Sequence, residues 1–399
     1  MNTSRRIYFD YASATPVIPE AARAVAEAQN LIGNPSSIHA EGVAAAAMLT
    51  KAREGIVRHL GCKARELVFI SGGTEANSLA ILGFARATII HGRALNAESL
   101  KGTHWIVSAI EHPSVLECFA EVERLGGSVS FADPDKCGII HPETIERLLR
   151  PETIFVSIGW ANSEIGIIQP LARIARVFRA HEKKYGTTVI FHSDAGQAPL
   201  YEAAHVHTLA VDLLTLDSGK MYGPRGIGAL YLSDRVVLAP LILGGKQERG
   251  LRAGTENIAL AAGFAAAFEV MAKERDVESA RVRDLRDKLS AEIFARIPGA
   301  IVNGDLRHSL PHVLNISLPR INSEYVILAL DHAGIAASTK SACREGEEQR
   351  SHVVEELGGD AFRSRNTLRF SLGRETKPAD ISRCIETLVT IVQSDASRS

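Results

Sequence analysis

Residues 213–232 read LLTLDSGKMYGPRGIGALYL, and this stretch decides the fold because two apolar runs rich in strand-forming residues flank a short turn. The turn contains Gly219, Gly223 and Gly226, which predicts a close return of the chain between two strands. Lys220 lies in this turn, at the edge of the predicted sheet. A lysine in such a turn is ordinarily a solvated loop residue. Whether Lys220 has a functional role must be judged from the segments around it.

Four more short apolar runs precede this stretch and alternate with segments of helical period. They are ELVFISGG at 66–73, HWIVSAIEH at 104–112, TIFVSIGWAN at 153–162 and TVIFHSDAG at 188–196. This alternation is typical of an α/β fold with a mostly parallel sheet. Each run ends in small or polar residues, and ligands of open α/β sheets bind beyond the carboxyl ends of the strands. We therefore expect these endings to converge on one crevice.

The last third of the chain predicts a second, smaller domain. Residues 258–286 are Ala-rich and then charged, which indicates one long helix that links two parts of the molecule. The elements expected after it are a strand at 313–318, a helix at 323–332, a strand at 367–373 and a terminal helix from Pro378. We predict a large domain over 15–262, and a small α+β domain formed by 1–14 and 263–399 that carries Cys343.

Composition narrows the classes of partner. A chain of 399 residues with 46% hydrophobic residues is long enough for two globular domains. The formal net charge of -1 provides no general attraction to polyanions. We therefore expect small molecules or proteins as partners, with no direct nucleic-acid binding and no membrane association.

The cysteines argue for a reducing environment. The chain has five, and they are scattered without a CxxC pair, which disfavours both a disulfide framework and a structural zinc site. We expect no metal ligands. The amino terminus lacks the apolar region of a signal peptide, and no run reaches the roughly 18 apolar residues of a membrane helix. These features predict a cytoplasmic protein.

Three strand endings carry groups that could serve one ligand. Residues 71–75, SGGTE, follow a strand and open a helical segment, so their free amides would face an anion, although a plain turn is the commoner use of such a sequence. Asp194 closes an apolar strand, where its carboxylate either caps a helix or contacts a cofactor. An aldehyde cofactor requires a lysine beside an anion-binding site and a carboxylate. Lys220 is therefore a candidate for the lysine that binds such a cofactor.

Two residues of the predicted small domain are also candidates. Cys343 lies in the polar stretch SACREGEEQRS, so we expect its thiol to be accessible, with Lys340 and Arg344 lowering the thiol pKa and nearby glutamates raising it. Arg369 alternates with apolar neighbours in a strand and is expected to point away from the core. From the strand alone, a carboxylate clamp and a plain surface arginine are equally good interpretations.

Ten short motifs follow one another along the chain. They are FDYASATP at 9–16, GNPSS at 33–37, SGGTEAN at 71–77, EHPSVL at 111–116, ANSEIG at 161–166, SDAGQ at 193–197, GKMYGPRGIGAL at 219–230, GGKQERGLRAGTEN at 244–257, SAC at 341–343 and RFSLGR at 369–374. In this order they resemble the NifS/IscS-type cysteine desulfurases of the class V aminotransferase family, which are fold-type I pyridoxal-phosphate (PLP) enzymes. The resemblance runs from Tyr8 to about Val392 and implies a seven-stranded, mostly parallel sheet flanked by helices.

The resemblance also implies PLP as the cofactor and assigns a role to each site residue. At the ring these are Lys220 as the lysine that binds the aldehyde, Asp194 on the pyridine nitrogen, His112 stacked on the ring, and Asn162 and Gln197 near the 3-hydroxyl. At the phosphate they are Gly73, Thr74 and Ser218, with Thr255 reaching the phosphate of a neighbouring subunit. At the substrate they are Asn34, Asn162 and Arg369. The residues alone favour a plainer role for His112 and Asn162, as hydrogen-bonded groups at strand ends.

The implied reaction converts L-cysteine to L-alanine. A proton leaves the substrate Cα, the Cys343 thiolate attacks the substrate sulfur, and the resulting persulfide passes to a protein sulfur acceptor. The length of chain from Cys343 to Leu357 favours cysteine over selenocysteine as substrate. The shared phosphate site implies a homodimer. Iron–sulfur cluster assembly, tRNA thiolation and DNA phosphorothioation are the candidate pathways, and the short segment after the last helix places a docked iron–sulfur scaffold in doubt.

The sequence departs from the family beside Lys220. Gly219 stands where a histidine is usual, and Asp217 stands where a phosphate-binding serine is expected. A carboxylate there must either point away or be offset by Ser218 and a cation. Two alternatives therefore stay open. One is another class V PLP enzyme, such as a selenocysteine lyase or an aminotransferase, and the other is a PLP-binding partner protein whose catalysis has decayed.

Overall fold

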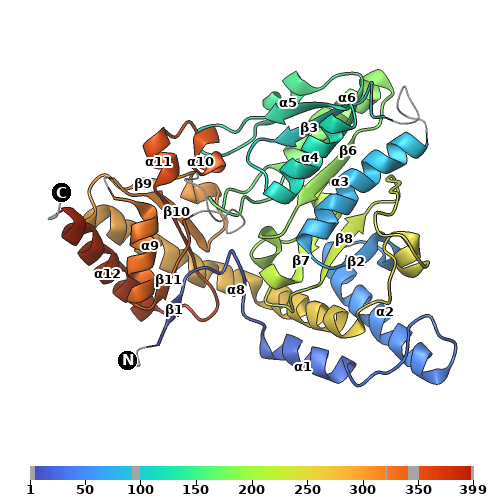
Figure 1. Ribbon diagram of the computed structural model, residues 1–399, viewed down its shortest axis with the longest axis horizontal. Helices are drawn as coiled ribbons and strands as arrows, with labels where there is room; N and C mark the ends of the chain where they lie inside the picture. The colour runs from blue at the N-terminus through green and yellow to red at the C-terminus, as the bar shows by residue number, and fades with distance from the viewer. Residues whose placement is uncertain (1–4, 92–98, 320, 340–349, 397–399) are drawn as a thin grey trace.

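A seven-stranded sheet forms the centre of the larger part of the molecule (Figure 1). The computed structural model describes residues 5–91, 99–319, 321–339 and 350–396. The strand order is β2-β8-β7-β6-β5-β3-β4; within the described residues β8 runs antiparallel to both β2 and β7, and the other pairs are parallel. The strands are β2 Leu67–Ile70, β3 His104–Ser108, β4 Ser128–Ala132, β5 Thr153–Ser157, β6 Ile190–Asp194, β7 Leu213–Asp217 and β8 Gly228–Leu232. The predicted mostly parallel sheet is confirmed.

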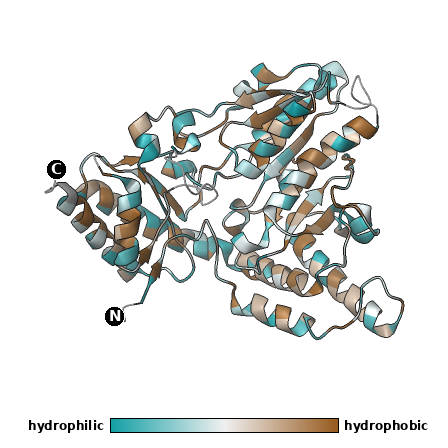
Figure 2. Ribbon diagram, in the orientation of Figure 1, coloured by the Kyte–Doolittle hydropathy of each residue, from teal (hydrophilic) through white to brown (hydrophobic). Residues whose placement is uncertain are grey.

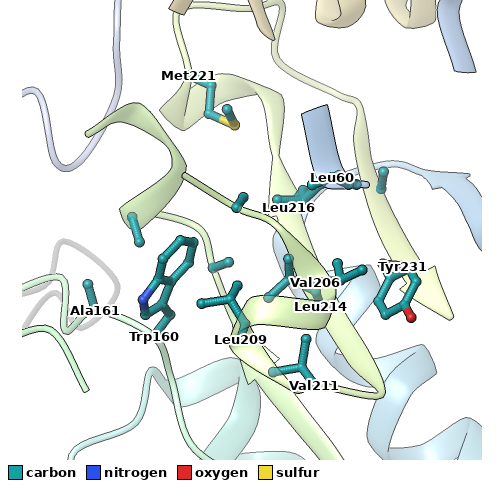
Figure 3. Packing of buried hydrophobic residues seen from close by; sticks show 14 of the residues in the cluster. Leu60, Trp160, Ala161, Val206, Leu209, Val211, Leu214, Leu216, Met221 and Tyr231 are labelled. Atoms are coloured by element: carbon teal, nitrogen blue, oxygen red, sulfur yellow. The ribbon is translucent and has the colours of Figure 1, made fainter. Parts of the chain in front are cut away.

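Helices cover both faces of this sheet, which explains why its strands read as continuous apolar runs. Adjacent residues of one strand face opposite cores: Ile190 packs in the core that contains α3 and α4, and Phe191 in the core that contains α2 and α6. Figure 3 shows part of the second of these cores, with Leu214 of β7 and Tyr231 of β8. The helices of this part are α1 Pro19–Ala28, α2 Ala40–Leu60, α3 Gly73–Ile90, α4 Pro113–Arg124, α5 Pro142–Leu148, α6 Leu171–Tyr185 and α7 Val206–Leu209.

Helix α8, Ile258–Arg296, connects the two parts of the molecule. Its first half places Phe264 and Phe268 in a core of the large sheet, and its second half places Leu285 and Leu289 in a separate core. The predicted linking helix is therefore present, although it continues to Arg296. Because α8 contributes to both cores, the domain boundary at residue 262 stays a prediction.

Two small sheets build the second part. A three-stranded antiparallel sheet has the order β12-β10-β9, and a parallel pair joins β1 to β11. The elements are β1 Ile7–Tyr8, β9 Ile301–Val302, β10 Val313–Ser317, α9 Ser323–His332, β11 Ile335–Ala336, α10 His352–Glu356, α11 Ala361–Arg365, β12 Thr367–Ser371 and α12 Pro378–Ala396. The N-terminal segment thus packs with the C-terminal residues, and apolar residues of β10 and β12 share a core with α12, in the part of the ribbon where Figure 2 shows brown, hydrophobic stretches.

A helix that crosses a membrane must be long and apolar, and this requirement can be compared with the helices in the described ranges. No helix in those ranges is both long enough and apolar enough to cross a membrane.

Candidate active site

A cavity of about 290 Å³ opens where the strands of the large sheet end and residues of the C-terminal part approach them. Loops that follow β2, β3, β5, β6 and β7 contribute to its wall, as the strand endings predict. Eight of the predicted site residues line it: Gly73, Thr74, His112, Asn162, Asp194, Gln197, Lys220 and Arg369. The structure brings these eight together, and their individual roles stay predictions.

Asp194 presents a carboxylate at the floor of the cavity, and two donors fix its orientation. The Gly196 amide donates to Oδ1 at 2.8 Å, and the Asn77 side-chain amide donates to Oδ2 at 2.7 Å. Asp194 is therefore not a helix cap. Since a carboxylate offers about four acceptor positions, it can still accept a hydrogen bond from a ligand.

His112 lines the same cavity as Asp194 and Asn77, and it is the N-cap residue of helix α4. Its Nδ1 accepts a hydrogen bond from the Ser114 amide at 3.1 Å and lies 2.8 Å from the Ser114 hydroxyl oxygen, which itself accepts from Asn77. Burial lowers the pKa of the His112 imidazole, the Asp194 charge opposes this, and the Lys220 charge adds to it. A neutral ring with its Nδ1 engaged in this way is held in one orientation against the cavity.

Lys220 reaches the cavity from a 3-10 turn, Ser218–Lys220, that directly follows β7. Its Nζ donates to the carbonyl oxygens of Ala12 at 3.1 Å and Ser13 at 2.5 Å. The amine is thus directed toward the N-terminal segment, across the cavity from the sheet. Its neighbours in the turn, Ser218 and Gly219, are buried.

Arg369 points away from the core that holds Leu368 and Phe370, as expected, but it is buried in the cavity, with 2% of its surface exposed. Its Nη2 donates to Asp10 Oδ1 at 2.8 Å and to Ser13 Oγ at 2.6 Å, and its Nη1 donates to the Ser163 carbonyl at 3.0 Å. These acceptors come from two other segments of the chain, and they draw the side chain into the cavity. The surface-arginine interpretation is thereby removed.

Gly73 opens helix α3 at the cavity, where helix geometry leaves amides for an anion. One of these amides is already engaged, because Gly73 donates to Asp217 Oδ2 at 3.0 Å. Asp217 therefore points into the cavity, and the suggestion that it points away is wrong. Thr74, the next residue, is exposed and lines the cavity.

The side chains of Asn162 and Gln197 are tied to the backbone around the cavity. Asn162 donates from Nδ2 to the Ile110 carbonyl at 2.8 Å and accepts from the amides of Glu164 and Ile165. Gln197 donates from Nε2 to the Ala12 carbonyl at 2.8 Å. The plainer interpretation of Asn162, a hydrogen-bonded group at a strand end, describes its contacts well.

Four predicted residues are not placed in this cavity. Ser218 is fully buried behind it, and its hydroxyl has no hydrogen-bond partner among the described residues. Asn34 and Thr255 are exposed on loops outside it. Cys343, together with Lys340 and Arg344, lies outside the described residues.

The sequence reasoning missed Asn77, Ser114 and Asp10, which orient Asp194, His112 and Arg369. Each belongs to a quoted motif, but only Ser114 is close in sequence to the residue that it orients, so Asn77 and Asp10 left no local signal. Glu111, next to His112, was also missed. Its Oε1 accepts the Gly159 amide at 2.5 Å, and burial raises the pKa of its carboxyl to about 8.

Replacing Glu111 by glutamine is expected to flatten the pH dependence of stability. The native protein holds a proton on Glu111 that the unfolded chain releases above its ordinary pKa of 4.5, so the free energy of unfolding falls as the pH rises toward 8. The slope is up to about 1.4 kcal/mol per pH unit. Urea unfolding at several pH values between these two limits measures it. Equal slopes in both proteins would contradict the assignment.

Comparison with known proteins finds relatives over nearly the whole chain. The family pattern of class V aminotransferases matches residues 7–384. The cysteine desulfurase IscS of Dictyoglomus turgidum is 36% identical over 98% of this chain and 95% of its own length. A solved NifS-like protein has a TM-score of 0.88 at 29% identity, covering 98% of this chain and 100% of its own. The structure of SspA in complex with cysteine has a TM-score of 0.78 at 31% identity, covering 92% and 99%.

Proposed function

The chain belongs to the class V aminotransferase family and is a cysteine desulfurase, and we propose that it holds pyridoxal phosphate at Lys220 and receives the sulfur of L-cysteine on Cys343. The observation that carries the proposal is the convergence of Lys220, Asp194, His112 and Arg369 on one cavity. An amine, a carboxylate, an imidazole and a guanidinium are the groups that this cofactor and an amino-acid carboxylate require. The relative SspA is in complex with cysteine, which supports cysteine as the substrate.

The residues around the cavity fit the cofactor. Asp194 is oriented by Asn77 and Gly196 and has acceptor capacity left for a pyridine nitrogen. The Lys220 amine reaches the same cavity, and helix α3 begins there at Gly73 with its positive dipole end. When bound, pyridoxal phosphate supplies an electron sink that stabilises negative charge on the substrate Cα.

The protein side chains would prepare this chemistry in two ways. The Asp194 carboxylate would favour the protonated form of a pyridine nitrogen, because a nearby opposite charge stabilises the charged form of a base. The Lys220 amine would take the proton from the substrate Cα.

Arg369 is proposed to bind the substrate carboxylate, and its replacement by lysine tests this. Lysine cannot form two parallel hydrogen bonds to a carboxylate, so we expect the KM for cysteine to rise about tenfold or more with a smaller change in kcat. Steady-state alanine formation measures both constants. Arg296→Lys, which alters an exposed pair with Glu386, is the matched control. An unchanged KM in Arg369→Lys would contradict the assignment.

The segment that carries Cys343 is attached beside the cavity at both ends. Ser338 exchanges two backbone hydrogen bonds with Arg369, at 2.7 and 3.1 Å, and His352 lines the cavity. Cys343 is five residues from Ser338 in the sequence, so it can extend at most about 18 Å from this anchor. This reach supports Cys343 as the sulfur acceptor.

The transfer step balances without an outside oxidant. The Cys343 thiolate attacks the sulfur of the substrate, and a sulfur–sulfur bond forms while the substrate bond between Cβ and sulfur breaks. The electron pair of that bond stays on the carbon side, which takes up protons and leaves as alanine. A persulfide remains on Cys343, ready for a protein sulfur acceptor.

A homodimer is part of the proposal. Asn34 and Thr255, assigned to the substrate and to a phosphate, are exposed outside the cavity of their own chain. Two exposed apolar residues flank Asn34, namely Ile32 at 88% and Ile38 at 98% exposure. Apolar residues so exposed favour burial by another chain, and a second copy would bring Asn34 and Thr255 to a site.

A cytoplasmic location and a protein sulfur acceptor complete the proposal. The described cysteines Cys62, Cys118, Cys137 and Cys384 are free thiols, which supports a reducing compartment. The acceptor follows from the chemistry, because the outer sulfur of a persulfide is transferred by the attack of a thiolate or another nucleophile that can approach it.

The proposed function is tested by incubating the purified protein with PLP, cysteine and a reductant. We expect an absorbance band at about 420 nm from the cofactor bound to Lys220, and sulfide and alanine in equal amounts. An aminotransferase would form a keto acid without sulfide. A protein with decayed catalysis would show the band and neither product.

A further inference from the structure

Asp217 occupies the anion seat at the start of helix α3. Its Oδ2 accepts the Gly73 amide at 3.0 Å, and its Oδ1 accepts the Gly219 amide at 2.8 Å. The carboxylate thus binds an amide that the dipole of α3 directs toward an anion. Asp217 also lines the cavity that contains Lys220.

The packing around this carboxylate is close. A Cβ atom built on Gly73 would lie 3.2 Å from Asp217 Oδ2, and one built on Gly72 would lie 3.6 Å from the same atom. The turn between β2 and α3 therefore surrounds the Asp217 side chain, and a phosphate cannot take the Gly73 amide while Asp217 holds it.

Glu75, another carboxylate at the start of α3, differs from Asp217 in having an ion-pair partner. Glu75 accepts the Ser71 amide on Oε2 at 2.8 Å and forms an ion pair with Arg252 at 3.1 Å. For Asp217, no ion pair is found within the part of the chain that the structure describes. The Asp217 charge at the seat is accordingly balanced by backbone amides.

We infer that Asp217 is an internal competitor for the phosphate of the cofactor: its carboxylate closes the seat when pyridoxal phosphate is absent and must give up the Gly73 amide when the phosphate binds. This inference rests on the proposed function. A like charge at ~5 Å, at an effective dielectric constant near 20, changes a binding constant by about two orders of magnitude, and screening by salt reduces this. The penalty acts on the phosphate alone, so it does not extend to a cofactor analogue that lacks that group.

The test compares two ligands on the full-length protein freed of cofactor. Dissociation constants of pyridoxal phosphate and of pyridoxal are measured by the absorbance of the Lys220-bound aldehyde, for the wild type, Asp217→Ser and Asp217→Asn. Asp234→Asn, which removes an exposed carboxylate paired with Arg65, is the matched control. We expect both Asp217 variants to bind pyridoxal phosphate about 10- to 100-fold more tightly. Pyridoxal should bind all four proteins with similar affinity.

The outcomes separate the inference from the proposed function. Unchanged or weaker binding of pyridoxal phosphate in both Asp217 variants would overturn the inference. An equal gain in affinity for pyridoxal phosphate and for pyridoxal would overturn it as well. In either case, a Lys220-bound aldehyde band would still support the proposed function. If no protein forms the Lys220-dependent band with either ligand, the proposed function fails as well. Asn is nearly isosteric with Asp, so this variant supplies the answer if Asp217→Ser does not fold.

Discussion

Alanine formation from cysteine is expected to fall by at least about a thousandfold when Lys220 is replaced by alanine, and the absorbance band of the bound cofactor is expected to disappear. Lys220 is assigned both the attachment of the cofactor aldehyde and the movement of the Cα proton. Among the described residues that line the cavity it is the only lysine. The measurement is the absorbance spectrum together with alanine release in the presence of saturating cofactor.

Lys101→Ala is the control for this experiment. Lys101 is exposed and does not line the cavity, so its removal changes the total charge without touching the site. This variant should keep both the band and the activity. A Lys220→Ala protein that retained either the band or alanine formation would show that another group binds the cofactor.

Replacing Cys343 by alanine is expected to lower sulfide release from cysteine by roughly a thousandfold or more. The absorbance band of the bound cofactor should stay as in the wild type. The Cys343 thiol is assigned as the nucleophile toward the substrate sulfur, and none of the four described cysteines lines the cavity. Burial raises the pKa of the Cys62 and Cys384 thiols to about 12, which leaves them protonated and unreactive at neutral pH.

Cys137→Ala is the matched control, since Cys137 is partly exposed and lies outside the cavity. It should release sulfide as the wild type does. Retained activity in Cys343→Ala would favour a selenocysteine lyase or an aminotransferase, in which this cysteine is incidental. Mass spectrometry of the wild type after one turnover should find one added sulfur on the peptide that contains Cys343.

The large sheet could be predicted because its strands are buried on both faces. Runs such as 67–70, 154–156 and 189–191 are apolar without alternation, and the polar residues that follow them mark the edge where the cavity forms. The bounds of the helix at 323–332 also agree with the sequence pattern. The C-terminal end of α8 was placed too early because its last turns are charged, and these turns pack one face into the second core.

Side-chain direction in the site could be predicted only in part. The position of Lys220 follows from a local turn between two strands, so nearby residues suffice to place it. The direction of Arg369 depends on Asp10, which is 359 residues away in the sequence. Strand alternation placed Arg369 opposite its apolar neighbours but could not reveal that its face of the sheet is covered by the N-terminal segment.

The amino-acid sequence was enough to identify the family, the succession of strands and helices along the chain, and the residues that end the strands, because local hydrophobic period and motif order depend on neighbouring residues along the chain. Tertiary structure alone decided that Arg369 is buried on Asp10 and Ser13, that Asn77 orients Asp194, and that Asp217 takes the Gly73 amide. Each of these contacts joins segments far apart in sequence. Their geometry is set by how the sheet, the helices and the N-terminal segment pack, and no local pattern encodes that packing.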